Sequence, residues 1–374
     1  MKRWQLRLRV WPCCFLVAVL AGCQPSSSDS SSSSPNGAGV KRLILLTNGD
    51  DPFWDAMRTG MEKAAQDIKL SDAKLAVFLD KGDFSDEAQI SKLSQYATQS
   101  DIAAVAISPV DPENRGIADA MRELRDKGVH VLCIDSDMDM TRYRDTRFAY
   151  MGTNNVMGGT ELGRAAKGLR AEGGVYATFV GLKAVANAHE RISGFAAGAG
   201  EAFREVESLA DGGDENIAQE NVKAALNNHP DIDTMVGIWA YNAHAIVEVV
   251  KDRDLRNRTT IVVFDAAELA LKDMSEGYVD AMVVQNPYQM GYLGTTLMKA
   301  LAEGDHSVIQ GMYPNYDETS GEISAGSDIF TTELRVVVPD DTSPLKPEMF
   351  EENTKFFTFA EFSEWLAERK LKGS

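Results

Sequence analysis

Polar and aromatic side chains follow several short apolar runs of this sequence, and they are the residues whose types could do chemistry. The set contains carboxylates, amides and aromatic rings. Carboxylates and amides offer fixed acceptors and donors to hydroxyl groups, and aromatic faces suit the apolar side of a sugar ring. The pattern therefore favours a neutral ligand with several hydroxyl groups. The segments are Asn48–Trp54, Ser108–Pro109, Asp135–Asp137, Tyr241–Asn242 (which comes after Trp239), Asp265 and Gln285–Asn286.

Other chemistries lack the residues they need. No run fits a P-loop, and Gly198–Gly200 lacks a third glycine and does not directly follow an apolar run. The five histidines, at positions 130, 189, 229, 244 and 306, show no metal-ligand spacing, so we expect no metal and no cofactor. Asp135 and Asp265 could form the acid and base pair of a glycosidase, but nothing in the sequence fixes their separation. Cys133 lies in an apolar run, where a lone cysteine is usually an inert hydrophobe rather than a catalytic thiol.

The elements that must position these residues alternate between strand and helix. From Arg42 onward, short runs rich in Val and Ile alternate with stretches of helical period, such as Asp55–Ile68 and Asn155–Leu169. This alternation is typical of βα units around a parallel sheet, where ligands bind beyond the carboxyl ends of the strands. The predicted strands are Arg42–Thr47, Lys74–Leu79, Ile102–Ile107, His130–Ile134, Phe148–Met151, Val175–Val180, Val206–Leu209, Thr234–Ile238, Thr260–Phe264 and Ala281–Val284.

The number of strands predicts two lobes. About ten strands exceed what a single compact doubly wound sheet normally holds, so we predict an α/β fold of two Rossmann-like lobes, each a doubly wound parallel sheet. We assign residues 40–150 and 287–328 to an N-terminal lobe. Residues 153–285 and 330–374 form the predicted C-terminal lobe, which includes a C-terminal extension.

The end of the chain predicts further structure. Ile329–Val338 is β-rich and ends at Pro339. Thr358 and Glu361 have the spacing of a capping box, which predicts a helix that runs to Lys370. Its apolar side chains recur at helical spacing, so we expect this helix to dock on the body; they are Phe359, Phe362 and Leu366.

The first 39 residues are typical of an export signal and a tether. Residues 1–22 have a basic start, an apolar stretch and small residues before Cys23, which is the layout of a secretory signal peptide. Leu20–Cys23 also resembles a bacterial lipobox, which implies cleavage before Cys23 and acylation of its thiol. The alternative is a plain signal peptide with an incidental cysteine. Residues 23–39 include eight serines between positions 26 and 34, so they predict a flexible tether or an unordered tail.

The composition excludes several classes of protein. The 374 residues are 44% hydrophobic and 25% charged, which suits a globular protein of about two domains and rules out collagen, coiled coil and wholesale disorder. Lys and Arg number 38 against 56 Asp and Glu, a formal net charge of −18. Such a field repels a phosphate backbone, so we expect no nucleic acid as a partner.

Seven short motifs occur in order between residues 40 and 338. They are Asn48 with Asp51–Trp54, Val105–Pro109, Gly128–Val131 leading to Asp135, Gly152–Asn155, Glu190–Phe195, Phe264–Asp265 and Gln285–Pro287. Each motif alone is weak, but in this order they resemble the type I periplasmic binding proteins, specifically the ribose- and related sugar-binding subunits of ABC importers. The resemblance implies two lobes that close on a ligand through three hinge crossings, near Met151–Thr153, Gln285–Pro287 and Ile329–Glu333.

The resemblance also implies roles for individual residues. Polar side chains would hydrogen-bond sugar hydroxyls or the ring oxygen, with Phe53 and Trp54 as aromatic walls, and we add Trp239 to the ligand-binding set. The polar residues are Asn48, Asp135, Arg191, Asn242, Asp265 and Gln285. Other roles stay open, because Asp265 could cap the next helix and Asn48 could start a turn. Arg191 could be a solvated charge, and the two tryptophans could belong to the core.

Three positions depart from the pattern of the family. Ser136 stands where some ribose binders carry a second arginine, and Asn187–His189 replaces the small residues common before Glu190. Tyr241–His244 lacks the acidic residue usually found after the asparagine. These differences leave the identity of the sugar open.

Together these features predict an exported, membrane-anchored lipoprotein of the periplasm or cell envelope. We expect a binding protein rather than an enzyme, monomeric, that closes on a monosaccharide, a ribose-like pentose or a hexose, and delivers it to the transmembrane subunits of an ABC permease. The alternatives are the same fold acting as a ligand sensor for a receptor or kinase, or binding a small polar ligand that is not a sugar. A transcriptional regulator with this body would need a helix-turn-helix where the tether stands.

Overall fold

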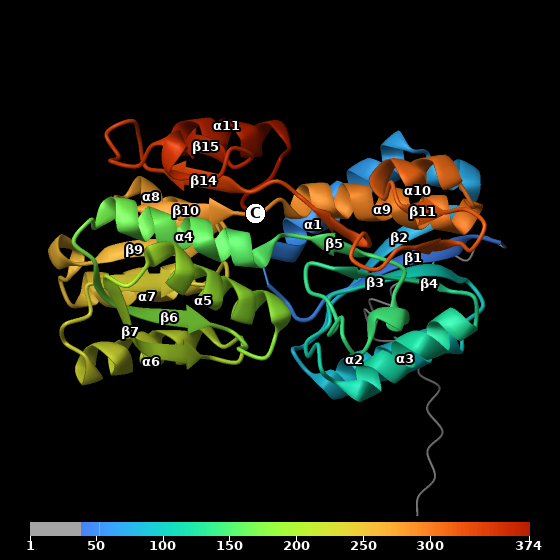
Figure 1. The fold of residues 1–374 in the computed structure, drawn as a ribbon, viewed down its shortest axis with the longest axis horizontal. Helices are drawn as coiled ribbons and strands as arrows, with labels where there is room; N and C mark the ends of the chain where they lie inside the picture. The colour runs from blue at the N-terminus through green and yellow to red at the C-terminus, as the bar shows by residue number, and fades with distance from the viewer. Residues whose placement is uncertain (1–38, 52) are drawn as a thin grey trace, which may run out of the picture. The chain divides into compact units, whose positions relative to one another are not determined.

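The computed structural model describes residues 39–51 and 53–374, and Figure 1 shows how their helices and strands are arranged. The predicted signal peptide, Cys23 and the predicted tether up to residue 38 lie outside the described residues. Each of the ten predicted strands is present, with ends shifted by no more than three residues. The predicted α/β fold is confirmed, because the described strands form two large sheets and a small hairpin of β11 (Tyr316–Asp317) and β12 (Glu322–Ile323).

The first sheet contains six parallel strands and is covered by helices on both faces. Its elements are β1 (Lys41–Leu46), α1 (Phe53–Asp67), β2 (Leu75–Asp80), α2 (Asp86–Ala97), β3 (Ile102–Ile107), α3 (Arg115–Asp126), β4 (His130–Ile134), β5 (Tyr150–Gly152), α9 (Pro287–Glu303), α10 (His306–Met312) and β13 (Ile329–Thr331). The strand order is β13-β5-β4-β3-β1-β2. Leu43 and Leu45 of β1 pack with α1 and α9, whereas Ile44 and Leu46 pack with α2 and α3. Burial on both faces explains the continuous apolar runs from which these strands were predicted.

The second sheet contains seven strands and is also covered on both faces. Its elements are α4 (Asn155–Leu169), β6 (Gly174–Val180), α5 (Ala186–Ala199), β7 (Phe203–Ala210), α6 (Glu215–Asn228), β8 (Thr234–Gly237), α7 (Asn242–Asp252), β9 (Thr260–Phe264), α8 (Glu268–Ser275), β10 (Ala281–Val284), β14 (Arg335–Val338), β15 (Lys355–Thr358) and α11 (Phe359–Glu368). The order is β15-β14-β10-β9-β8-β6-β7, and only β10 and β14 pair antiparallel. Helices α4 and α5 contribute to the core on one face, and α7, α8 and α11 to the core on the other. Short 3₁₀ turns complete the described elements, at Leu70–Ala73, Arg144–Thr146, Arg256–Arg258 and Pro347–Met349.

Glycines allow α4 and α5 to approach each other closely. A Cβ atom on Gly159 would lie 2.1 Å from the Arg191 carbonyl oxygen, and one on Gly194 would lie 2.2 Å from the Val156 carbonyl oxygen. Real Cβ atoms do not come so near a backbone oxygen, so both positions require glycine. The contact matters for the site because α5 carries Arg191.

The chain passes between the two sheets at three places, as predicted. The first follows β5, the second lies between β10 and α9, and the third lies between β13 and β14. Asn286 caps α9 by accepting a hydrogen bond from the Gln289 N–H, and Pro287 occupies the first turn. One predicted boundary needs correction: β13 pairs with β5, so Phe330 and Thr331 belong to the first sheet, not to the C-terminal lobe. We call the first sheet with its helices the N-terminal lobe, and the second sheet with its helices the C-terminal lobe. The motion of these lobes as separate bodies stays a prediction.

The C-terminal extension completes the edge of the second sheet. Strand β15 pairs with β14, and Thr358 forms the predicted capping box with Glu361 at the start of α11. Phe362 and Leu366 are buried in the core of this lobe, so the predicted docking of the last helix is confirmed. The ring of Trp365 covers the buried guanidinium of Arg335 at 3.9 Å.

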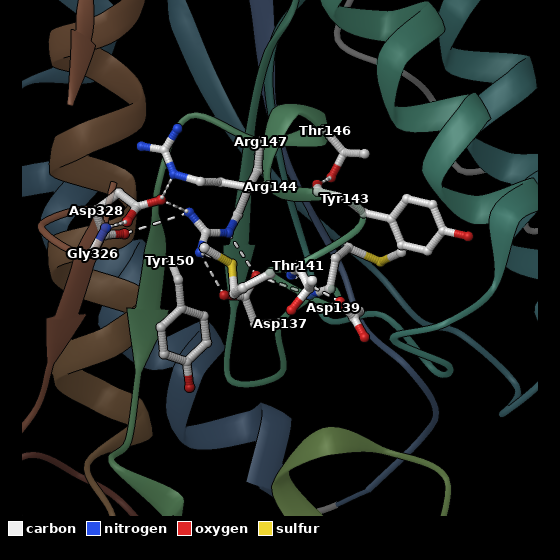
Figure 2. Close-up of polar contacts among 12 residues, drawn as sticks. Asp137, Asp139, Thr141, Tyr143, Arg144, Thr146, Arg147, Tyr150, Gly326 and Asp328 are labelled. Atoms are coloured by element: carbon white, nitrogen blue, oxygen red, sulfur yellow. Dashed lines mark hydrogen bonds and ion pairs between the residues drawn. The ribbon is translucent and has the colours of Figure 1, made fainter. Parts of the chain in front are cut away.

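A buried group of ion pairs fixes the start of β13 (Figure 2). The side chain of Arg147 is fully buried and donates to both carboxylate oxygens of Asp137 at 2.6 Å and to Asp328 at 2.9 Å. Arg144 Nε lies 3.1 Å from the same Asp328 carboxylate. Asp328 directly precedes β13, so these contacts tie the third crossing to the loop that follows β4.

Candidate functional site

A cavity lies where the carboxyl ends of strands from both lobes meet. Its empty volume is about 310 Å³, which includes the open solvent at its mouth. The N-terminal lobe contributes Asn48, Asp51, Phe53, Trp54, Phe84 and Asp135 to its lining. The C-terminal lobe contributes Asn187, Arg191, Trp239, Ala240, Asp265 and Gln285. The site is therefore shared between the two lobes.

Two aspartates occupy equivalent positions in the two lobes. Asp135 directly follows β4 and Asp265 directly follows β9, and both have left-handed backbone conformations, with φ of 65° and 69°. Residues other than glycine rarely adopt this conformation, and when they do they are often found at functional sites. Asp265 does not cap the next helix, because Ala267 is the N-cap residue of α8 and no side chain caps it. The turn instead directs both carboxylates into the cavity lining.

Arg191 is a buried cation rather than a solvated one, with 1% of its surface exposed. Its Nε donates to Asn155 Oδ1 at 3.0 Å, its Nη1 donates to the Ile238 carbonyl at 3.3 Å, and its guanidinium carbon lies 3.9 Å from the centre of the Phe264 ring. These contacts hold the guanidinium between two carboxylates, with Nη1 3.6 Å from Asp265 Oδ2 and Nη2 4.0 Å from Asp135 Oδ1. Among the described residues, Nη2 has no hydrogen-bond partner.

Neighbouring side chains orient the carboxylates. Asp135 Oδ2 accepts hydrogen bonds from Ser108 Oγ at 3.0 Å and from Asn187 Nδ2 at 3.2 Å. Asp265 Oδ2 accepts from Gln285 Nε2 at 3.0 Å, and Gln285 Oε1 in turn accepts from Thr153 Oγ1 at 2.8 Å. No described residue donates a hydrogen bond to Asp265 Oδ1. Because Thr153 and Gln285 lie at two of the crossings, the crossings and the site are directly connected.

Burial without full compensation raises the pKa values of these carboxyl groups. Desolvation raises the pKa of Asp265 to about 7 and that of Asp51 to about 6, and the charge of Arg191 opposes both shifts. The pKa of Asp135 is raised for the same reason, with Arg191, Ser108 and Asn187 opposing the shift. The three carboxyl groups also repel one another, so their protonation is coupled.

Aromatic rings form two pairs in the wall. Phe53 and Trp54 meet edge to face, with ring centres 4.9 Å apart. Phe84 stacks on Trp239 at 5.8 Å, which brings rings from the two lobes together. Trp239 Nε1 donates to Asn187 Oδ1 at 3.3 Å, so the indole is fixed in orientation. Both tryptophans pack in core clusters and also line the cavity, and their contact with a ligand stays a prediction.

Comparison with known protein families identifies the family of this fold. A family model described as "Periplasmic binding protein domain" matches residues 43–306, more than half of the chain. The chain belongs to the periplasmic binding protein family.

Individual relatives of this periplasmic binding protein support the same fold. The chain is 24% identical to the D-allose-binding periplasmic protein of Escherichia coli over 279 residues, which are 70% of the chain and 84% of that protein. A solute-binding protein of an ABC transporter from Burkholderia graminis, in complex with D-arabinose, superposes with a TM-score of 0.68 at 20% identity and covers 82% of this chain and 98% of its own. A solute-binding protein from Agrobacterium vitis, bound with α-D-tagatopyranose, gives 0.68 at 18% identity, with 83% and 100% covered. At these identities the two structures establish the fold.

Eight of the nine predicted ligand-binding residues line the cavity of this periplasmic binding protein, and Asn242 does not. Asn242 is fully buried; its Oδ1 accepts from the Trp239 N–H and its Nδ2 donates to Asp211 Oδ2, both at 3.0 Å. Because the protein occupies both ends of the amide, Asn242 holds the turn that carries Trp239. The structure thus places Asn242 behind the cavity wall, and a direct ligand contact by this residue stays an untested prediction.

Four lining residues were not predicted: Asp51, Phe84, Asn187 and Ala240. Asp51 lies within the same motif as Asn48, but Asp50 precedes it directly, and the sequence gave no reason to choose one of these two aspartates as a lining residue. Phe84 is in a loop, with φ of 60°, and the Asn48 carbonyl accepts a hydrogen bond from its N–H at 2.8 Å. Loop residues carry no periodic signal, so the sequence could not place Phe84.

The described residues offer neither a metal site nor a membrane-spanning helix. Within residues 39–51 and 53–374, no group of three or more potential side-chain ligands could hold a metal ion. Over the same residues, none of the helices has both the length and the apolar character that crossing a bilayer requires.

Proposed function

We propose that this protein binds a monosaccharide in the cavity between its lobes and delivers it to an ABC permease. The observation that carries the proposal is a set of three buried polar atoms that have no hydrogen-bond partner in the described part of the chain. They belong to residues that line the cavity: Arg191 Nη2, Asp265 Oδ1 and Asp51 Oδ2. Buried polar atoms are nearly always hydrogen-bonded, so these atoms indicate a ligand that both donates and accepts. The relatives named for D-allose, or bound with D-arabinose and α-D-tagatopyranose, support a sugar.

The proposed contacts follow from the chemistry of each group. Ionised Asp135 and Asp265 accept hydrogen bonds from hydroxyls, and Arg191 Nη2 donates to a hydroxyl or ring oxygen. Asn48 and Gln285 lie in the same lining and supply amide groups. Aromatic rings cover the apolar faces of the sugar ring. Hydrogen bonds to charged groups contribute about 1.5–3 kcal/mol each, enough for a few of them to reject analogues that lack a hydroxyl.

Closure of the lobes is the step that we propose couples binding to delivery. A ligand that touches both lobes binds the closed form more tightly than the open form and so shifts the population toward it. The permease then recognises the closed form. In this proposal the protein is a monomer outside the cytoplasm, held at the membrane by a lipid on Cys23.

A thermal-shift screen tests the binding step. The protein, expressed from its full sequence and solubilised in detergent, is screened against pentoses, hexoses, sugar alcohols and amino acids. A ligand at 100 times its dissociation constant adds about 2.7 kcal/mol, so a true ligand raises the midpoint by a few degrees. Shifts confined to one or two sugars support the proposal. A shift with amino acids and none with sugars would refute the sugar assignment while leaving the fold unaffected.

Replacement of Cys23 by alanine tests the anchor. We expect the wild type in the membrane fraction and Cys23→Ala outside that fraction or retained with an uncleaved signal. Identical membrane association of a cleaved, unacylated variant would contradict lipidation at this residue. The transport step is tested by sugar uptake in cells that lack the protein, where a ligand-dependent signalling response without uptake would favour the sensor alternative.

A further inference from the structure

The charged side chains that line the cavity are unbalanced. Among the described lining residues, three carry carboxylates, Asp51, Asp135 and Asp265, and one carries a cation, Arg191. The guanidinium lies within 4.0 Å of Asp135 and Asp265 and therefore serves both. Asp51 has no cation within 4.0 Å among the described side chains. The lining thus has two more carboxylates than cations.

The surplus includes carboxylate oxygens that have no hydrogen-bond partner within residues 39–51 and 53–374. Asp265 is 2% exposed and its Oδ1 accepts no hydrogen bond. Asp51 Oδ1 accepts from the Phe53 N–H at 2.8 Å, whereas its Oδ2 is buried and accepts nothing. These unpartnered oxygens belong to two lobes and to one cavity.

A neutral sugar can supply hydrogen bonds to the unpartnered oxygens but not a positive charge. Hydroxyl groups donate hydrogen bonds to the free oxygens, but they bring no charge to offset the surplus, and uncompensated buried charge is costly. An ammonium group brings three donors and one positive charge in a compact group. The raised pKa values of Asp51 and Asp265 agree with a site whose carboxylates lack a counter-charge.

We propose that the ligand is a monosaccharide that carries an ammonium group, an amino sugar, and that Asp51 is the residue that selects it. This inference rests on the proposed function, because it names the class of sugar that the same cavity takes. The ammonium group contacts the free oxygen of Asp51, and hydroxyls of the same ring contact Asp135, Asp265 and Arg191.

Calorimetric titration with matched sugars tests the proposal. Each hexose is compared at pH 7 with derivatives that replace one hydroxyl at a time by an ammonium group, and with the N-acetylated form of each amine, which keeps the size and removes the charge. A charge-assisted bond in place of a neutral one is worth about tenfold or more in affinity. We expect at least one amino sugar to bind at least tenfold more tightly than both its parent hexose and its N-acetyl derivative.

Two variants assign the effect to its residue. Asp51→Asn keeps the oxygen that accepts from the Phe53 N–H and removes the charge, so the ratio of amino-sugar to parent affinity falls at least tenfold. Asp50→Asn is the matched control, because Asp50 is the neighbouring carboxylate, is exposed, pairs with Lys81 and does not line the cavity; its ratio changes less than about twofold. Circular dichroism checks that both variants fold.

The outcomes separate this inference from the proposed function. Tight binding of neutral hexoses, with every amino sugar equal or weaker, would overturn the inference and leave the proposed function standing. An unchanged ratio in a folded Asp51→Asn variant would overturn the role of Asp51. Failure of every sugar, charged or neutral, to bind the wild type would overturn both.

Discussion

Replacing Asp265 by asparagine is predicted to stabilise the unliganded protein at high pH. Asparagine has the same shape and can still accept from Gln285, but it carries no charge that burial penalises. Desolvation raises the pKa of Asp265 from 3.8 to about 7, so below pH 4 the carboxyl is protonated in both the folded and unfolded chain. Between pH 4 and 7 the folded chain holds a proton that the unfolded chain has lost, so the stability contributed by this group falls as pH rises.

The size of the effect follows from the same linkage. With pKa values of 3.8 unfolded and about 7 folded, the stability contributed by this carboxyl decreases by about 2–3 kcal/mol between pH 5 and pH 8. Asp265→Asn has no carboxyl group at this position. Its free energy of unfolding, relative to that of the wild type, should therefore be about 2–3 kcal/mol more favourable at pH 8 than at pH 5. Asp51, Asp135 and Arg191 line the same cavity in the variant and in the wild type. Their own contributions to the pH dependence of the free energy of unfolding therefore largely cancel when the two proteins are compared.

Urea unfolding at pH 5 and pH 8, followed by circular dichroism, measures the difference. The matched control is Asp50→Asn, because Asp50 is an exposed carboxylate. The difference in the free energy of unfolding between this variant and the wild type should stay constant within about 0.5 kcal/mol from pH 5 to pH 8. If the free energy of unfolding of Asp265→Asn differs from that of the wild type by the same amount at both pH values, the Asp265 carboxyl group is not desolvated. That result would refute the premise that the cavity buries this group.

Three further substitutions probe the parts that position the site. Arg191→Met should weaken sugar binding by tenfold or more in titration calorimetry, because it removes the cation and its free Nη2 donor, whereas Arg204→Met, at an exposed ion pair, should leave affinity unchanged. Asp328→Ala should lower the free energy of unfolding, measured in urea, by about 3 kcal/mol, because it leaves the buried Arg147 with one carboxylate partner. The control is Asp145→Ala, which removes an exposed ion pair and should lower the free energy of unfolding by less than about 1 kcal/mol. Equal losses for these two would contradict a structural role for the buried pairs. Gly159→Ala should destabilise by about 1–3 kcal/mol and weaken binding, because the new methyl group collides with the Arg191 carbonyl; unchanged affinity and stability would show that α4 and α5 have room to separate.

The sequence predicted the sheets well for a physical reason. Strands buried on both faces are continuous apolar runs, so β3 and β4 could be read to the residue. The residue that follows such a strand is also readable, which is how Asp135 and Asp265 became candidates, and the family resemblance then implied their role in ligand binding. The capping box at Thr358 was a local signal and was equally reliable.

What the sequence could not supply was the three-dimensional neighbourhood of each side chain. Asn242 follows a strand like the other candidates, but its amide is taken up by the Trp239 backbone and by Asp211, a partner 31 positions away. Phe84 reaches the cavity from a loop with a left-handed backbone. The surplus of carboxylates became visible only when Asp51 was placed in the same cavity as the two strand-end aspartates.

The crystal structure of the protein with the sugar that gives the largest thermal shift is the most direct test of the central claim. We expect one sugar ring in the cavity between the lobes, with polar atoms of the ligand within hydrogen-bond distance of Arg191 Nη2, Asp265 Oδ1 and Asp51 Oδ2. A ligand bound elsewhere, such as in the wider groove lined by Lys183 and Glu190, with these three atoms still unpartnered, would contradict it.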